Sequence, residues 1–204
     1  MNRHIQTMGK FAAACGVAIG FSTAAFAAPT NLVPTANTNP PIGHFEFCKA
    51  YSNECTSLGR DRGPMALSRK AWATMLEVNT QVNQSIQPDT DRNIYGVEEL
   101  WAYPRTVGDC EDYVLLKRHM LMQKGFAPND LLITVVLQPN GDGHAVLTVR
   151  TDYGDYILDN MRGDVRLWSE TGYTFIKRQS SEHAARWTKL GPGSATANVG
   201  TIKN

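Results

Sequence analysis

Residues 108–137 read GDCEDYVLLKRHMLMQKGFAPNDLLITVVL, and this stretch decides the fold class. Its first half carries apolar residues at three- and four-residue steps until Gly125, which is typical of an amphipathic helix and its stop. After Pro128, the run Leu131–Leu137 is apolar and rich in β-branched residues, as in a buried strand. The stretch therefore predicts a helix with Cys110 in its first turn, followed by a strand.

Further elements are predicted on both sides of this stretch. Upstream, Ser68 is placed to cap a helix that runs to about Ile86, with apolar residues along one face. Downstream, β-rich runs at Ala145–Thr151 and Tyr156–Leu158 follow turn-forming segments, and Tyr173–Lys177 is a further candidate strand. Two helices and an antiparallel meander predict an α+β fold.

Length and charge exclude several classes of protein. The chain has 204 residues, with 20 Lys and Arg against 19 Asp and Glu, and it has no basic block. We therefore expect no nucleic-acid binding. No stretch of 18 or more apolar residues follows the N-terminal region, so we expect no membrane span there. We also expect a monomer. One domain is predicted over residues 43–190, after a Pro-rich extended lead-in at 29–42 and before a Gly/Ser/Thr-rich flexible tail at 191–204.

The N-terminal 28 residues have the three regions of a secretory signal peptide. Arg3 and Lys10 are basic, an apolar run extends from residue 11 to residue 26, and small residues follow. We expect cleavage after Ala27 or Ala28, which leaves 18 basic and 19 acidic residues. The mature protein is predicted to be periplasmic or secreted.

Export changes the interpretation of the cysteines, because oxidising compartments favour disulfides. Cys48 and Cys55 lie close together in a segment that resembles a loop, and we predict that they are bridged. Cys110 is then left as an unpaired thiol, which is typical of a dimer linkage, an inert buried residue or a reactive group.

The position of Cys110 favours reactivity, but its neighbours oppose it. A helix N-terminus lowers the pKa of a thiol, because unpaired backbone N–H groups lie there. Asp109, Glu111 and Asp112 raise that pKa unless a cation offsets their charge. The sequence therefore raises a charge problem that a nearby cation could solve.

His144 is the histidine best placed to serve the thiol, because it follows a Gly-rich turn at the start of a predicted strand. His119 lies nine residues after Cys110 in the same helix, roughly 13 Å along it and on its other side. His44 and His183 are interpreted as structural or solvated residues. A third group usually orients a catalytic imidazole, and Asp159 at the end of a predicted strand is the candidate.

The hairpin geometry leaves the alignment of His144 and Asp159 open. A tip at residues 151–152 would place the two residues directly opposite each other. Turn-forming residues at 153–154 suggest a later tip, which would offset the pair by two to four residues unless a bulge or twist compensated.

Four motifs in order resemble the bacterial transglutaminase-like cysteine peptidases. The likeness covers roughly residues 42–190, including the cysteines near its start. The motifs are Trp101-Ala102-Tyr103-Pro104, Gly108-Asp109-Cys110-Glu111-Asp112-Tyr113, Gly143-His144-Ala145-Val146-Leu147 and Ile157-Leu158-Asp159-Asn160.

This resemblance implies a papain-like α+β fold in which the helix with the thiol packs on an antiparallel sheet. It implies that Cys110 is the nucleophile, that His144 acts as base and then acid, and that Asp159 orients the imidazole. Relatives in the family include periplasmic proteases that clip large surface adhesins, so a protein or peptide substrate is implied, with a surface adhesin as one candidate.

The resemblance also implies calcium beside the cysteine, held here by Asp109, Glu111 and Asp112, whose hard oxygen atoms suit Ca²⁺. The alternative is that these acids only stabilise the helix N-terminus. No organic cofactor is expected.

Two other functions stay open besides a peptidase. A transglutaminase-like acyltransferase would use the same three residues and pass the acyl group to an amine. A catalytically silent, calcium-stabilised binding domain would lack a competent base for its thiol. For the oxyanion, the backbone N–H of Cys110 is the expected donor, with Trp101 or Tyr95 as side-chain helpers.

Overall fold

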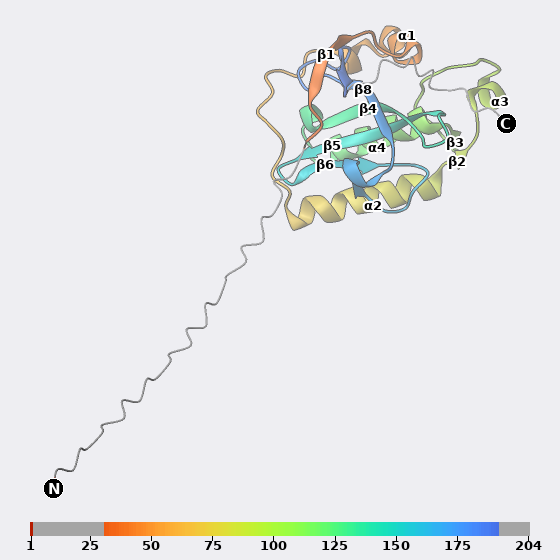
Figure 1. Cartoon of the computed structure of the whole chain (residues 1–204). Coiled ribbons are helices and arrows are strands. Elements are labelled where there is room, and N and C mark those ends of the chain that lie inside the picture. The colour runs from red at the N-terminus through yellow and green to blue at the C-terminus, as the bar shows by residue number, and fades with distance from the viewer. Residues whose placement is uncertain (2–30, 192–204) are drawn as a thin grey trace.

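The computed structural model describes Met1 and residues 31–191. The predicted signal peptide, apart from Met1, and the predicted tail, apart from Gly191, lie outside these residues. Figure 1 shows the described part as a sheet with helices around it.

Within residues 31–191, the main sheet has seven antiparallel strands in the order β1-β9-β8-β4-β5-β6-β7. The strands are β1 (Pro34–Thr38), β4 (Leu131–Leu137), β5 (Gly143–Thr151), β6 (Gly154–Leu158), β7 (Arg166–Leu167), β8 (Thr174–Gln179) and β9 (Trp187–Leu190). A separate parallel pair joins β2 (Gln87–Pro88) to β3 (Val107–Gly108). The predicted meander is β4, β5 and β6, and the predicted strand at Tyr173–Lys177 is β8, shifted by one to two residues.

The helices are α1 (Ile42–Ala50), α2 (Arg69–Ser85), α3 (Asp91–Tyr95) and α4 (Cys110–Gln123), with short 3₁₀ turns at η1 (Ser52–Cys55), η2 (Pro128–Asp130) and η3 (Trp168–Glu170). Ser68 caps α2 as predicted, because its Oγ accepts the N–H of Ala71 at 3.0 Å. Among the described residues, none of these helices combines the length and the apolarity that a bilayer crossing requires.

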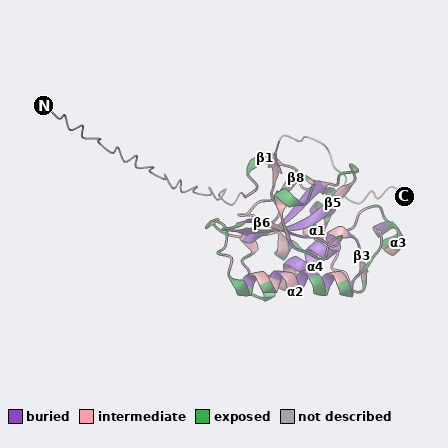
Figure 2. Cartoon of the chain, turned by 60° about the horizontal axis from the view of Figure 1, so that its bottom comes forward, coloured by how far each residue is buried: buried purple, intermediate pink, exposed green. Residues whose placement is uncertain are grey.

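The main core lies between α2, α4 and one face of the sheet. Met75, Val78 and Val82 of α2 are fully buried, and they belong to the same cluster as Val135 of β4 and Leu147 of β5. Each such side chain stabilises the fold by about 1.5–3 kcal/mol relative to exposure. Figure 2 shows the resulting contrast on α2 between its buried and its exposed residues.

A smaller cluster covers the other face of the sheet. Val136, Val146 and Ile157 alternate with the residues of the main core along their strands, so their side chains point the opposite way. Phe175 of β8 and Leu190 of β9 complete this second layer. Both faces of the central strands are therefore buried.

The segment expected to be an extended lead-in takes part in the sheet. Residues 34–38 form β1, which pairs with β9, and Leu32 just before it is buried. β1 lies at the edge of the sheet, where a strand tolerates proline because one side needs no partner. The folded part of the chain therefore begins before Gly43, and the predicted boundary was wrong. The reason is that β1 pairs with a strand about 150 residues away, which local composition does not reveal.

The segment around the paired cysteines is helical, whereas the sequence suggested a loop. Cys48 lies in α1 and Cys55 ends η1. Their disulfide is present as predicted, with the two Cα atoms 5.5 Å apart. The disulfide links α1 to the turn that follows it. Gly43 lets α1 pack closely against Trp101, because a Cβ at this position would lie 2.3 Å from Cδ1 of Trp101.

Candidate active site

Cys110 is the first residue of α4 and opens onto a cleft of about 810 Å³. His144, the second residue of β5, lies in the wall of the same cleft. The cleft thus brings together the end of a helix and the end of a strand that lie 34 positions apart in the chain. Its other lining residues come from the end of β2 and the segment around α3, the residue before α4, the β4–β5 turn with the first residue of β5, and the segment after β6. They are Pro88, Asp89, Thr90, Arg92, Asn93, Glu98, Asp109, Gln138, Asn140, Asp142, Gly143, Asn160 and Met161.

His144 and Asp159 are joined by a hydrogen bond between Nε2 and Oδ1 at 2.8 Å. The β5–β6 hairpin pairs Leu147 with Leu158 and Thr151 with Gly154, so its register places Asp159 across from the position two residues beyond His144. This is the lower end of the predicted offset. Such diagonal neighbours share a face of the sheet, and long side chains bridge them.

Asp159 is almost fully buried but stays in the charged form. Burial alone raises the pKa of this carboxyl, yet hydrogen bonds from His144, Tyr173 and the backbone of Met161 outweigh it, and the net pKa is lowered. Asn83 of α2 also donates from Nδ2 to the Asp159 carbonyl at 2.9 Å and to that of Arg162. The carboxylate is therefore held as an anion beside the imidazole.

The Cys110 thiol donates its hydrogen to Oε2 of Glu111 at 2.8 Å, and no hydrogen bond joins it to His144. Burial raises the pKa of this thiol, and the charges of Glu111 and Asp109 raise it further, while the N–H of Ala145 acts in the opposite direction. In this arrangement the thiol is protonated near neutral pH. The charge problem inferred from the sequence is thus present in the structure.

A group of three buried carboxylates lies beside the thiol. One ligand atom from each of Asp91, Asp109 and Asp112 lies within 4.8 Å of the others. Each of the three also has a buried oxygen without a hydrogen-bond partner. Glu111, which the sequence analysis grouped with Asp109 and Asp112, is not in this group: its Oε2 accepts from Cys110, and its Oε1 is buried without a hydrogen-bond partner.

The electrostatics of this group favour binding of a cation. Burial, opposed by hydrogen bonds and reinforced by neighbouring acids, raises the pKa of Asp109 to about 6 and that of Asp112 to about 8. The pKa of Asp91 is also raised by burial. Unpartnered buried carboxylate oxygens are costly unless something neutralises them. Hard oxygen ligands of this kind fit Ca²⁺.

Asp91, the first residue of α3, was missed by the sequence analysis, which named only Asp109, Glu111 and Asp112 as acids of the site. The parallel β2–β3 pair brings this segment beside Gly108, and the N–H of Asp89 donates to the Gly108 carbonyl at 3.1 Å. A Cβ on Gly108 would lie 2.9 Å from the Asp112 carboxylate, so glycine gives Asp112 its room. The local signal was only an acidic residue at the start of a short helix.

The three other histidines of the described residues lie outside the cleft, as their sequence context suggested. His44 is buried against Trp187, and burial followed by the charge of Arg118 lowers its pKa to about 3. His119 contacts Gln123 at 2.8 Å, and His183 accepts the N–H of Ala185.

Neither aromatic residue suggested as an oxyanion helper lines the cleft. Trp101 is buried, and its Nε1 donates to Oε1 of Glu99 at 2.9 Å. Tyr95 is part of α3 and is exposed. The backbone N–H of Cys110 therefore remains the expected oxyanion donor.

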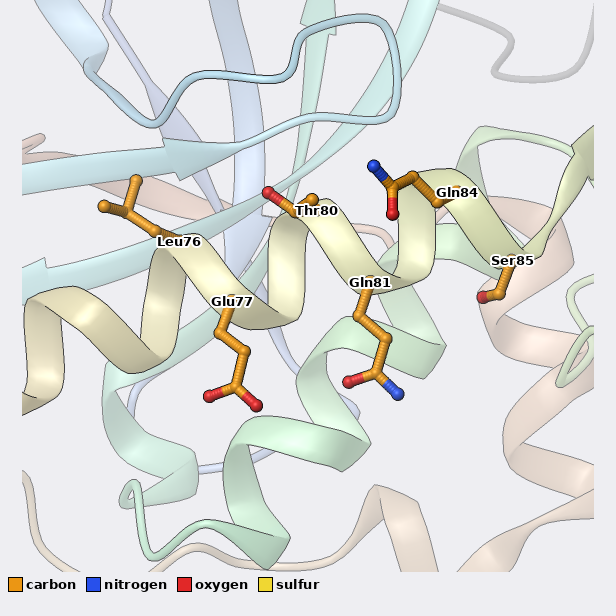
Figure 3. A pocket seen from close by; sticks show the side chains of 6 residues that line it. All are labelled: Leu76, Glu77, Thr80, Gln81, Gln84 and Ser85. Atoms are coloured by element: carbon orange, nitrogen blue, oxygen red, sulfur yellow. The ribbon is translucent and has the colours of Figure 1, made fainter.

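A second hollow of about 560 Å³ lies along the outer side of α2. Figure 3 shows Glu77 and Gln81 pointing from α2 toward α4, while Leu76 and Thr80 point the other way. Glu77 contacts Lys124, at the end of α4, at 3.3 Å. Its lining contains no cysteine or histidine, so the hollow has no catalytic group comparable to the cleft.

A thiol at the start of a helix, facing a sheet that carries a bonded histidine and carboxylate, defines an α+β fold of the papain and transglutaminase type. The chain belongs to the bacterial transglutaminase-like cysteine proteinases, whose family model matches residues 34–195. This confirms the resemblance and makes the protein a transglutaminase-like cysteine peptidase by family.

Three solved structures of LapG from Legionella pneumophila are similar to this chain. One matches with 23% identity and a TM-score of 0.49, covering 57% of this chain and 66% of LapG, just under two thirds. The calcium-bound LapG has 22% identity and a TM-score of 0.50, covering 64% and 74%, and EGTA-treated LapG has 21% identity and a TM-score of 0.49, covering 62% and 74%. At this identity the likeness concerns the fold. Comparison with curated proteins finds no match.

Proposed function

We propose that this protein is an exported cysteine peptidase that cleaves a protein substrate through Cys110, His144 and Asp159. The observation that carries the proposal is that Cys110 shares one cleft with His144, whose Nε2 is bonded to a buried, charged Asp159. Family membership supports the peptide bond as the target.

The chemistry follows from the free atoms of the site. Nε2 of His144 is engaged by Asp159, so Nδ1 is the nitrogen left to take the proton from the thiol. The sulfur then attacks the peptide carbonyl, the C–N bond breaks, and His144 returns the proton to the leaving amine. Water, deprotonated by His144, resolves the thioester and releases the acid. Before this can begin, the Cys110 thiol must exchange its hydrogen bond to Glu111 for one to His144. Such a rearrangement is common, because catalytic hydrogen bonds often form only when substrate is bound.

We also propose that calcium binds beside the catalytic helix, held by Asp91, Asp109 and Asp112. The support is the three unpartnered buried oxygens and the raised pKa values of these acids. LapG of the same fold has a calcium-bound structure. When bound, the ion would supply positive charge that offsets acids which otherwise oppose ionisation of the thiol. Glu111 stays a further candidate ligand, because its Oε2 accepts from Cys110 while its Oε1 is buried without a hydrogen-bond partner.

Calorimetric titration tests the calcium site directly. Ca²⁺ is expected to bind the wild type, and Asp91→Asn is expected to weaken binding by about 10- to 100-fold, since it removes one charged ligand. Asp130→Asn is the matched control, because Asp130 is also buried, has an unpartnered oxygen and a pKa raised by burial to about 6, but lies outside the three-carboxylate group. Its calcium affinity should equal that of the wild type.

Absence of calcium binding by the wild type would remove the metal from the proposal. Equal weakening in Asp91→Asn and Asp130→Asn would mean that the effect is one of general stability. Magnesium is expected to compete poorly, because it requires small octahedral geometry.

Two measurements separate the peptidase from the other two functions. Labelling and turnover distinguish it from a silent domain, and the acceptor of the acyl group distinguishes it from an acyltransferase. We expect the mature protein to be labelled by a thiol-directed probe and to hydrolyse members of a peptide library, with the new carboxyl group detected by mass spectrometry. In the presence of a primary amine, hydrolysis should still dominate. Mainly amide product would make it a transferase, and neither labelling nor turnover with calcium present would make it a binding domain.

Export and a surface protein as substrate remain proposals. The Cys48–Cys55 disulfide fits an oxidising compartment such as the periplasm. The family supports a protein substrate, and a surface adhesin is the candidate that the resemblance suggested.

A further inference from the structure

Tyr173 contacts both members of the histidine–carboxylate pair. Its hydroxyl donates to Oδ2 of Asp159 at 2.6 Å, while Oδ1 accepts His144 at 2.8 Å and the N–H of Met161 at 2.9 Å. Both oxygens of the carboxylate are therefore engaged, and the donors come from β5, the segment after β6, and the residue before β8.

The ring of Tyr173 also contacts His144. The two ring centroids lie 5.7 Å apart with planes at 71°, which is an edge-to-face contact. Tyr173 therefore limits rotation of the imidazole by packing and rotation of the carboxylate by a hydrogen bond. It lines a separate hollow and is not among the residues that line the cleft.

Strand order explains how Tyr173 reaches this position. β4 lies between β8 and β5, and Leu137 of β4 pairs with both Thr174 and Gly143. Tyr173 directly precedes Thr174, and His144 directly follows Gly143. Gly172, with φ of +76°, makes the turn before Tyr173, a conformation that favours glycine.

Two basic side chains lie near this network. The Arg162 guanidinium lies 6.0 Å from the centre of the Tyr173 ring. Lys117 of α4 is fully buried and interacts electrostatically with Asp159. Burial and the bond to Asp159 raise the pKa of Tyr173 to about 12, so the hydroxyl keeps its proton and donates. Without it, Oδ2 would be a buried charged acceptor lacking its donor.

We propose that Tyr173 is a positioning residue of the active site, which sets the orientation of Asp159 and, through it, of His144. This inference rests on the proposed roles of Cys110, His144 and Asp159. Tyr173 acts through its hydrogen bond to Asp159 and its packing on His144, and it transfers no proton itself.

The test is Tyr173→Phe, which keeps the ring and removes the hydroxyl. We expect kcat to fall about tenfold with KM unchanged, the loss typical of one hydrogen bond to a charged group. The downfield ¹H NMR signal of the His144 Nε2 proton, assigned by its absence in His144→Ala, should shift or broaden by exchange. This signal requires no turnover, so it tests the network even if the peptidase function is wrong.

Tyr103→Phe is the matched control, because the Tyr103 hydroxyl also donates to a carboxylate, Oε1 of Glu54 at 2.8 Å, and Tyr103 does not line the cleft. It should leave kcat and the His144 signal unchanged. An unchanged His144 signal in folded Tyr173→Phe would overturn the proposal. So would an equal change in Tyr103→Phe, which would indicate a general loss of stability.

Discussion

Replacing Cys110 by alanine is expected to abolish both peptide hydrolysis and labelling by a thiol-directed probe. Removing the nucleophile of a catalytic triad typically costs on the order of 10⁶ in kcat, so no turnover above background should remain. Cys110→Ser should be equally inactive, because a serine hydroxyl ionises far less readily than a thiol in a site rich in acids. Intact-mass measurement after probe treatment and a peptide assay provide the two readouts.

The fold should survive this substitution. Cys110 is only partly buried, and alanine is a good residue for the first turn of a helix. The thermal unfolding midpoint is therefore expected to stay close to that of the wild type. The two other described cysteines are bridged, so in the mature protein without reductant only Cys110 should react. Turnover retained by a folded Cys110→Ala variant would show that another residue is the nucleophile.

His144→Ala is expected to lower kcat by roughly 10²–10⁴, because it removes the group that transfers the proton. Asp159→Asn should be less severe, since the amide oxygen can still accept from the imidazole while its charge is lost. The effect of Asp159→Asn should be the smaller one, because Asp159 acts only through the hydrogen bond between its Oδ1 and Nε2 of His144. Steady-state kinetics with a cleaved peptide measure both effects, and thiol-probe labelling shows whether Cys110 is still accessible.

His183→Ala is the control for His144→Ala. His183 lies outside the cleft and is only partly buried, so its loss should leave kcat unchanged. His44 is a poor control, because it is buried and contacts Trp187 and Gln179, so its removal would destabilise the core. If His183→Ala were as damaging as His144→Ala, the assignment of the base would be wrong.

The sequence by itself determined the parts of this protein that depend on local pattern. Helical periodicity and the cap at Ser68 predicted α2, and the run after Pro128 predicted β4, because these signals lie within one element. Motif order identified the family and nominated Cys110, and the short spacing of Cys48 and Cys55 predicted their disulfide.

Tertiary structure decided which distant residues meet at the cleft. Asp91 joins Asp109 and Asp112 because the β2–β3 pair brings two separate segments together, and Glu111 turns to the thiol within the buried site. Tyr173 reaches Asp159 because β8 pairs with β4. Pairing between strands far apart depends on burial of both faces of the sheet, a property of the whole fold that no single window of sequence contains.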